Sequence, residues 1–242
     1  GWNNVFRIGP RRLALASLPD DESKFPVGSW VRDSLMQSIH VLALNSQAMR
    51  RPASPSLPRS FRPDGSNLPL VVRDLRERHA EVFRDWLAHV RTVLADIVDI
   101  DTRERPEDRH VYLQVTYRDG GPPVPSWLLS DGTLRFLALT LLAYLPEHQG
   151  IYLIEEPENG IHPRAIEAMF QSLSSVYDGQ VLLATHSPLI VGLAAERREQ
   201  ILCFAKTPSG ATDIVNGLDH PRLAEWRGDV DLSTLYAMGV LS

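Results

Sequence analysis

Residues 151–163 hold the feature that most constrains how this chain can fold. Four apolar, strand-forming residues run directly into Glu155 and Glu156, and a turn rich in Pro, Asn and Gly follows. Such a run is typical of a strand buried in a parallel sheet, where ligands bind at the carboxyl ends of strands. Because neighbouring strand residues point to opposite faces, one carboxylate can hold a hydrated magnesium ion while the other reaches a water beside a terminal phosphate. An ordinary solvated acidic turn is the alternative, and this stretch alone leaves both open.

A helix is predicted upstream, with Ser130 as its N-cap and an almost wholly apolar run up to residue 142. Because it is apolar on nearly every side, we expect it to be buried along its length. Its start combines free backbone N–H groups, the positive end of the helix dipole, a hydroxyl and Gly132, all of which suit a phosphate. Ser-Asp-Gly by itself is more often the start of an ordinary capped core helix, so this interpretation also stays open.

A second apolar strand is predicted at residues 181–184, and His186 follows it. Residues 163–176 have a helical apolar pattern, so the segment is predicted to be a strand, a helix and a strand in parallel. Glu155, Glu156 and His186 then lie at one edge of the sheet. A lone histidine at a strand end is usually hydrogen-bonded packing, but here it can also contact a terminal phosphate or an attacking water.

These three motifs, in this order, resemble the C-terminal half of an ABC-type ATPase. More narrowly, the chain is similar, from about residue 35 onward, to the predicted AAA-family ATPases related to the OLD, RecF and SMC proteins. The resemblance implies an α/β fold of the parallel-sheet, P-loop NTPase type with an additional helical segment, and ATP and Mg²⁺ as cofactors. A spacing of 26 positions from Ser130 to Glu156, and of 30 from Glu156 to His186, suits alternating helices and strands.

The resemblance implies that a signature sequence binds the terminal phosphate of a nucleotide held by the opposite subunit. Its matches are Ser130, Asp131 and Gly132. A D-loop that crosses the dimer interface is implied between Pro157 and Pro163. Its matching residues are Glu158, Asn159 and His162.

The resemblance implies a Walker B motif and a switch histidine as well. Glu155 matches the carboxylate of the magnesium shell, where the ABC pattern usually has the shorter Asp. Glu156 matches the catalytic glutamate that polarises the water, and His186 the catalytic switch histidine. We expect the helix start at Ser130, the acidic pair and the imidazole to line a common pocket at one edge of the sheet.

No P-loop is present in the sequence. Lys24 and Lys206 are the only lysines, and neither follows a Gly-x-x-x-x-Gly run. We therefore expect a lobe that carries the P-loop to precede this chain or to be a separate polypeptide. The heads are expected to form a homodimer that acts with an effector protein, and the isolated chain is expected neither to bind ATP tightly nor to hydrolyse it.

Two other functions stay open. The first is a non-catalytic regulatory or dimerisation head, which the missing P-loop favours. The second is the ATPase part of an OLD-type nuclease assembly. Asp229 and Asp231 form an Asp-x-Asp, but only 11 residues follow Asp231, too few for a further nuclease domain. DNA repair and phage defence are the biological roles that the resemblance suggests.

The chain is expected to divide into an irregular N-terminal segment, a helical and strand insertion region of the head, and the ABC-like C-terminal lobe. Their bounds are 1–27, 28–127 and 128–242. Residues 51–69 carry five prolines and predict a long surface excursion or a mobile loop, and residues 71–98 have a continuous helical pattern. The one cysteine, Cys203, excludes an internal disulfide and is expected to pack in the core.

A formal net charge of −5 gives no bulk attraction to nucleic acid, which leaves nucleic acid as an open partner only through a local patch. Arg50, Arg51, Arg59 and Arg62 form such a basic stretch, for which a solvated surface is the favoured interpretation. No segment has the roughly 18 apolar residues that span a bilayer, and no basic-then-apolar leader is present, so a cytoplasmic protein with no membrane partner is predicted.

Overall fold

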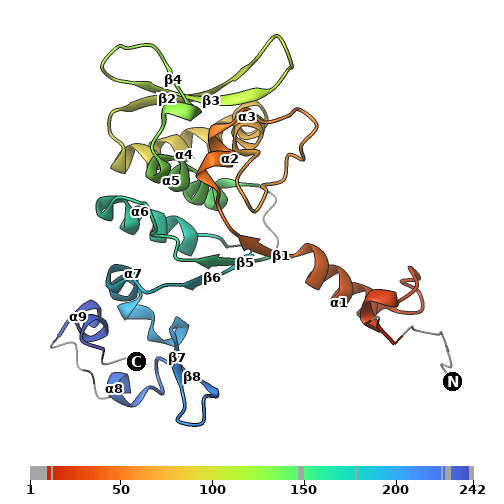
Figure 1. Ribbon diagram of the computed structural model, residues 1–242, viewed down its shortest axis with the longest axis vertical. Coiled ribbons are helices and arrows are strands. Elements are labelled where there is room, and N and C mark those ends of the chain that lie inside the picture. Colours follow the sequence, from red (N-terminus) through yellow and green to blue (C-terminus); the bar gives the residue numbers. More distant parts are fainter. Residues whose placement is uncertain are drawn as a thin grey trace.

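The computed structural model describes residues 10–11, 13–146, 150–177, 179–224, 226 and 230–239 of the 242-residue chain. Within these residues the chain has the predicted α/β fold, compatible with a P-loop NTPase-like architecture (Figure 1). The α-helices are α1 (Pro26–Gln37), α2 (Ser46–Arg50), α3 (Leu68–Arg78), α4 (Ala80–Val93), α5 (Asp131–Leu141), α6 (Pro163–Ser174), α7 (Pro188–Leu193), α8 (Pro221–Ala224) and α9 (Leu232–Ala237). The strands are β1 (Ile39–Leu42), β2 (Ile97–Glu104), β3 (Val111–Tyr117), β4 (Val124–Pro125), β5 (Gly150–Glu155), β6 (Gly179–Ala184), β7 (Leu202–Lys206) and β8 (Thr212–Asn216). Short 3-10 helices lie at Leu15–Ser17, Ser126–Leu128, Leu142–Tyr144 and Ala195–Gln200.

A three-stranded parallel sheet in the order β1, β5, β6 is formed by the described residues. The predicted strand, helix, strand unit is confirmed as β5, α6 and β6, which pair in parallel. The third strand, β1, comes from the segment before residue 128 and pairs in parallel with the other side of β5. The parallel sheet is therefore built from both the expected insertion region and the expected C-terminal lobe.

The two faces of this sheet differ in cover. Tyr152 and Ile154 of β5 are 6% and 5% exposed and belong to the same buried cluster as the apolar residues of α5 and α6, two helices that lie on one side of the sheet in Figure 1. Val41 and Leu182 belong to the row on the other face, because both are in register with Leu153. They are 61% and 40% exposed. Parallel sheets are normally covered on both faces, so an apolar face is left open here.

Above α5 and α6 in Figure 1, α3 and α4 pack beneath the antiparallel sheet in the order β2, β3, β4. The continuous helix predicted for residues 71–98 is wrong. The backbone of His79, at φ −132° and ψ 55°, separates α3 from α4, and Ile97 begins β2. Apolar positions continue at helical spacing across the break because both helices face the same core.

The proline-rich segment is a surface excursion, one of the two predicted alternatives, up to the start of α3 at Leu68, and it is anchored to the core. Asn67 is fully buried, and its side-chain amide donates to the carbonyl oxygens of Pro58 and Ser60, each at 2.7 Å, while its oxygen accepts from the backbone N–H of Arg62 at 3.0 Å. Ala53 pairs with Val111 at the start of β3. The segment is thus an ordered loop on the surface of this part of the molecule.

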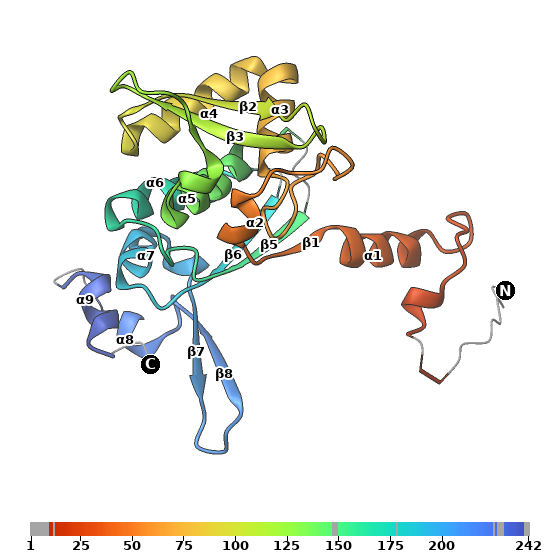
Figure 2. The ribbon, with the colours of Figure 1, turned by 45° about the horizontal axis from the view of Figure 1, so that its top comes forward.

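The chain after His186 includes an antiparallel hairpin of β7 and β8, which projects from the rest of the chain (Figure 2). Cys203, expected in the core, is half-buried in this hairpin between the exposed side chains of Leu202 and Phe204, since a two-stranded hairpin has no layer to cover both faces. Partial burial raises the pKa of its thiol. Asp229 of the Asp-x-Asp lies outside the described residues. No helix in the described part of the chain has the length and apolar character to cross a membrane.

Candidate functional site

The carboxyl ends of β5 and β6 bring the acidic pair and the histidine to one edge of the parallel sheet. Glu155 is in register with Ala184, the last residue of β6. The backbone N–H of Glu156 donates to the carbonyl oxygen of Ala184 at 2.7 Å. His186 follows Ala184 by two positions, so the expected common edge is confirmed.

Glu156 has an uncommon backbone conformation. Its φ of 44° lies in the left-handed region, which few residues other than glycine adopt. Two contacts hold it there: its N–H is fixed on Ala184, and its carboxylate accepts a hydrogen bond from the side-chain amide of Asn159. Backbones of this kind persist where the surroundings over-determine them, which occurs most often at functional sites. The turn after β5 therefore positions the Glu156 carboxylate.

Helix α5, which carries the residues that match the signature sequence, begins as predicted, with Ser130 as its N-cap. The Ser130 hydroxyl oxygen accepts from the backbone N–H of Thr133 at 3.1 Å and also hydrogen-bonds the Thr133 hydroxyl at 2.8 Å. Asp131 forms an ion pair of 2.6 Å with Arg50 at the end of α2. A second bond of Arg50, to the carbonyl oxygen of Leu129 at 2.9 Å, fixes the residue before the cap. The helix start is thus anchored to α2.

The start of α5 touches the turn that matches the D-loop. A Cβ atom on Gly132 would overlap the carbonyl oxygen of Gly160, so the two backbones are in direct contact. Beside this contact lies a cavity of about 120 Å³ that both segments line. Its lining residues are Leu94, Ser130, Gly132, Thr133, Phe136, Gly160, Ile161, His162 and Ala165. This volume is well below the roughly 300–1,000 Å³ of small-molecule pockets, so it suits a group of phosphate size and not a whole nucleotide.

The expectation of one common pocket is wrong. Neither the acidic pair nor His186 lines the cavity beside Ser130 and Gly132. The reason is topological: α5 starts against the far end of the turn, at Gly160, whereas Glu155 and Glu156 stand where β5 ends. Within one chain the signature residues and the acidic edge are two separate surfaces.

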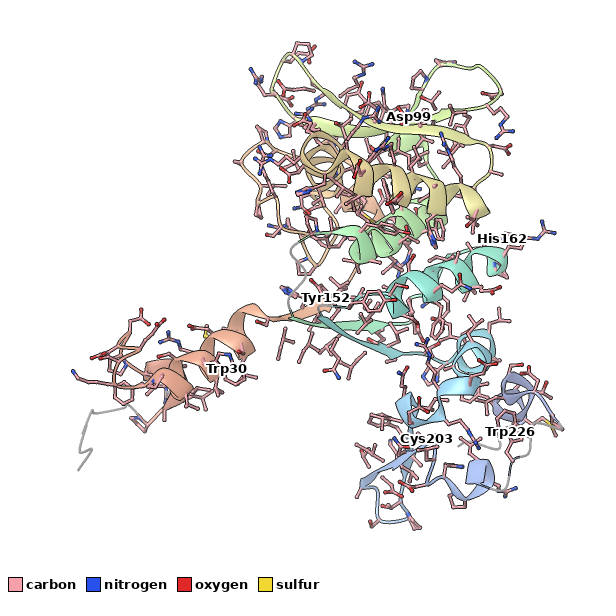
Figure 3. The ribbon with its side chains drawn as sticks, turned by 180° about the vertical axis from the view of Figure 1, so that it is seen from behind. Trp30, Asp99, Tyr152, His162, Cys203 and Trp226 are labelled. Carbon is pink, nitrogen blue, oxygen red and sulfur yellow. The ribbon has the colours of Figure 1, made fainter. Side chains whose placement is uncertain are left out.

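His162 and Glu158 are held by different neighbours. His162 is the N-cap of α6, and its ring Nδ1 accepts from the backbone N–H of Arg164 at 3.2 Å (Figure 3). Glu158 Oε1 accepts from the hydroxyl of Thr185 at 2.6 Å, while its Oε2 is buried with no hydrogen-bond partner among the described residues. Glu158 therefore faces inward, toward the residue before His186.

Two residues that sequence reasoning did not identify hold residues 185–187, which follow β6 and which we call the histidine loop. Thr185 bonds Glu158 and also accepts from the backbone N–H of Ser187 at 2.9 Å. The hydroxyl of Tyr236 in α9 lies 3.3 Å from His186 Nδ1. Thr185 could have been found from the sequence, because it directly precedes His186. Tyr236 lies 50 positions further along the chain and gave none.

The acidic pair has the donor chemistry that magnesium uses with nucleotides. Among the described residues no three His, Cys, Asp or Glu side chains gather in a way that could hold a metal ion. Magnesium is commonly bound through one or two carboxylates together with phosphate oxygens and waters, and a dedicated protein cage is not required. Glu155 and Glu156 fit that role only with a nucleotide present.

Comparison with known families matches residues 1–192 to a family described as "AAA domain, putative AbiEii toxin, Type IV TA system". The match covers more than half of the chain and includes Ser130, Gly132, Glu155, Glu156 and His186. No curated protein matches the chain.

Proposed function

Since the chain belongs to this AAA-domain family, whose domains have an ATPase-like nucleotide-binding function, we propose that it is the C-terminal half of an ABC-like ATPase head, related to the OLD, RecF and SMC heads. The head binds and hydrolyses ATP in a nucleotide-sandwich dimer, together with a lobe that carries the P-loop. The observation that carries this proposal is the strand register that sets Glu155, Glu156 and His186 at one sheet edge, with Glu156 in a left-handed backbone.

In this proposal the chain's own residues position and polarise the attacking water and the terminal phosphoryl group. Glu156, held by Asn159, accepts a hydrogen bond or a proton from the attacking water. His186 donates to the terminal phosphoryl group as charge develops there. Magnesium, when bound with the nucleotide beside Glu155, neutralises charge on the phosphate oxygens. Phosphoryl transfer needs little covalent chemistry from the protein, so positioning of this kind is sufficient.

In the dimer, the signature residues and the acidic edge, which is the sheet edge that carries Glu155 and Glu156, act on two different nucleotides. Ser130 and Gly132 line a separate cavity of about 120 Å³, which supports their acting on the terminal phosphate of a nucleotide held by the opposite head. Free N–H groups at the start of α5 favour an anion there. The hydroxyl of Ser130 now bonds Thr133, so it must rotate from that cap to reach a phosphate.

The open side of the parallel sheet supports a partner lobe. Among the described residues β6 pairs only with β5, so its outer edge is free. The exposed row through Val41 and Leu182 adds an uncovered apolar face. A P-loop lobe that adds a strand to β6 and a helix over this face covers both surfaces, and the absence of a P-loop in the sequence calls for such a lobe.

The test is to assemble the chain with its P-loop lobe and to measure ATP binding and turnover. Glu156→Gln keeps the size of the side chain and removes the base, so we expect nucleotide binding to persist, kcat to fall by about 100-fold or more, and the closed dimer to accumulate. Glu167→Gln, on the exposed side of α6, is the matched control. Full turnover in Glu156→Gln would remove Glu156 from this role.

The missing P-loop also favours a second function, a regulatory or dimerisation head that does not turn over ATP. An assembly that dimerises with ATP but hydrolyses none with wild-type Glu156 would support it. The OLD-type nuclease alternative gains no support from Asp231, which precedes α9 and accepts from the Ser233 hydroxyl. A role in a toxin–antitoxin system is carried by the family description alone.

A further inference from the structure

A surface pocket of about 470 Å³ lies apart from the acidic edge, at the junction of α2, the loop after β2 and the 3-10 helix Ser126–Leu128. Its lining residues are Gln47, Arg50, Arg51, Pro52, Arg105 and Trp127. We refer to it as the arginine pocket. Its volume lies within the roughly 300–1,000 Å³ that is usual for small-molecule sites.

The arginine pocket keeps a net positive charge once the ion pairs of its three arginines are counted. Arg50 is balanced by Asp131 at 2.6 Å, and Arg105 is balanced by Asp108, with an Nε to Oδ1 distance of 3.1 Å. Arg51 is exposed and forms no ion pair with any residue that the structure describes. One guanidinium therefore remains for an anion, and a planar, forked donor of this kind matches phosphate oxygens.

An aromatic ring stands beside this free cation. Trp127 is 46% exposed, although tryptophan is usually well buried. Its ring packs at an angle of 52° against Tyr112, with 5.0 Å between the ring centres, so the indole is braced from β3. Aromatic side chains braced in this way are platforms on which nucleic-acid bases stack.

We propose that the arginine pocket binds a nucleoside monophosphate unit, with the phosphate on Arg51 and the base on Trp127. Such a unit is either a free mononucleotide or the 5′-phosphorylated end of a single strand. The site is distinct from the proposed ATP site and does not depend on ATP turnover. Arg50 spans from the pocket to Asp131, beside Ser130, so an occupant is in contact with the residue that anchors the signature helix.

The experiment measures binding to the full chain without ATP. Titration calorimetry with AMP and dTMP tests the free nucleotide, and fluorescence anisotropy with a labelled, 5′-phosphorylated oligothymidine of ten nucleotides tests the strand end. The variants are Arg51→Ala and Trp127→Ala. Arg84→Ala is the matched control, because Arg84 is an exposed arginine on α4, far from the pocket in sequence and absent from its lining.

We expect each pocket variant to weaken binding by about tenfold or more, in keeping with the loss of one phosphate contact or one stacked base, and Arg84→Ala to leave it unchanged. Trp127→Phe, which keeps a ring, restores most of the affinity and gives a second readout if Trp127→Ala does not fold. Equal affinity for dTMP and oligomer identifies a free nucleotide, whereas much tighter oligomer binding identifies a strand end. No binding by either, or the same loss in Arg84→Ala as in Arg51→Ala, overturns the proposal.

Discussion

The carbonyl oxygen of Gly160 occupies the place that a Cβ atom on Gly132 would take. Backbone from the turn after β5 therefore lies directly against backbone at the start of α5, with no side chain between them. Gly160 itself has a φ of 76°, in the left-handed region that favours glycine. The contact fixes the spacing between the Ser130 hydroxyl and the His162 ring on the two walls of the small cavity.

Gly132→Ala is predicted to destabilise the chain by about 1–3 kcal/mol, the usual cost of forcing an atom into filled space. Helix propensity alone predicts the opposite sign, since alanine is favoured over glycine in helices by about 1 kcal/mol. Urea denaturation decides between them. Gly121→Ala is the control, because its nearest neighbour is the movable carboxylate of Asp119. A variant at Gly132 as stable as wild type would mean that the turn yields without cost.

Thr185→Val is predicted to loosen the histidine loop. The change removes the hydroxyl that bonds Glu158 Oε1 and accepts from the N–H of Ser187. Neither carboxylate oxygen of Glu158 then keeps a hydrogen-bond partner among the described residues, since Oε2 already has none. A buried group that loses its partner costs about 1–3 kcal/mol. Thermal unfolding should show Thr185→Ser close to wild type and Thr185→Val clearly lower; equal losses would assign the effect to packing.

Trp86 and Thr140 are predicted to be energetically coupled. Both are fully buried, and the indole N–H of Trp86 donates to the Thr140 hydroxyl at 3.1 Å, joining α4 to α5. Trp86→Phe and Thr140→Val should each destabilise by about 1–3 kcal/mol, with part of the Thr140→Val cost arising from the stranded indole N–H. That part vanishes in the double variant, so a denaturation cycle should give a coupling of about 1 kcal/mol. Strict additivity would contradict it.

Asp64 is predicted to make stability fall in acid. Partial burial would raise the pKa of this carboxyl, but hydrogen bonds from Ser66 and the charge of Arg62 outweigh it, and the pKa is lowered from 3.8. Since the folded state binds the proton more weakly than the unfolded state, the stabilisation is complete above pH 3.8 and is lost as the pH falls through the folded pKa. Asp64→Asn should therefore lose less stability than wild type between neutral pH and pH 3.

The control for that measurement is Asp213→Asn, a change at an exposed position of β8. Its melting temperature should follow the wild-type dependence on pH. If Asp64→Asn and wild type lose the same stability in acid, the bonds from Ser66 do not distinguish the two protonation states.

Local patterns were sufficient for the elements that carry the candidate site. Apolar runs ending in polar residues predicted β5 and β6, and the Ser130 cap predicted where α5 begins, because both signals depend on neighbours in the sequence. The order of the strands in the parallel sheet could not be predicted from such local patterns. The sequence around β1 does not indicate that this strand pairs with β5, because the choice of a neighbouring strand depends on packing between distant segments.

Contacts between distant residues account for what was missed at the site. The break at His79 is hidden because α3 and α4 bury their apolar faces in one core, which keeps the spacing helical across it. The prediction that Cys203 packs in the core was wrong, because an apolar run does not indicate how many layers of structure cover the strand that it forms. The hydrogen bond between His186 and Tyr236 joins residues on different helices and loops, so no local period encodes it.

The outer edge of β6 also bears on how the chain behaves when it is produced by itself. Its six residues carry no charge and no proline, two of the devices that prevent a sheet edge from pairing with another molecule. At high concentration, copies of the chain should associate through this edge into aggregates. Producing the chain together with a polypeptide that covers β6 should instead yield monodisperse material.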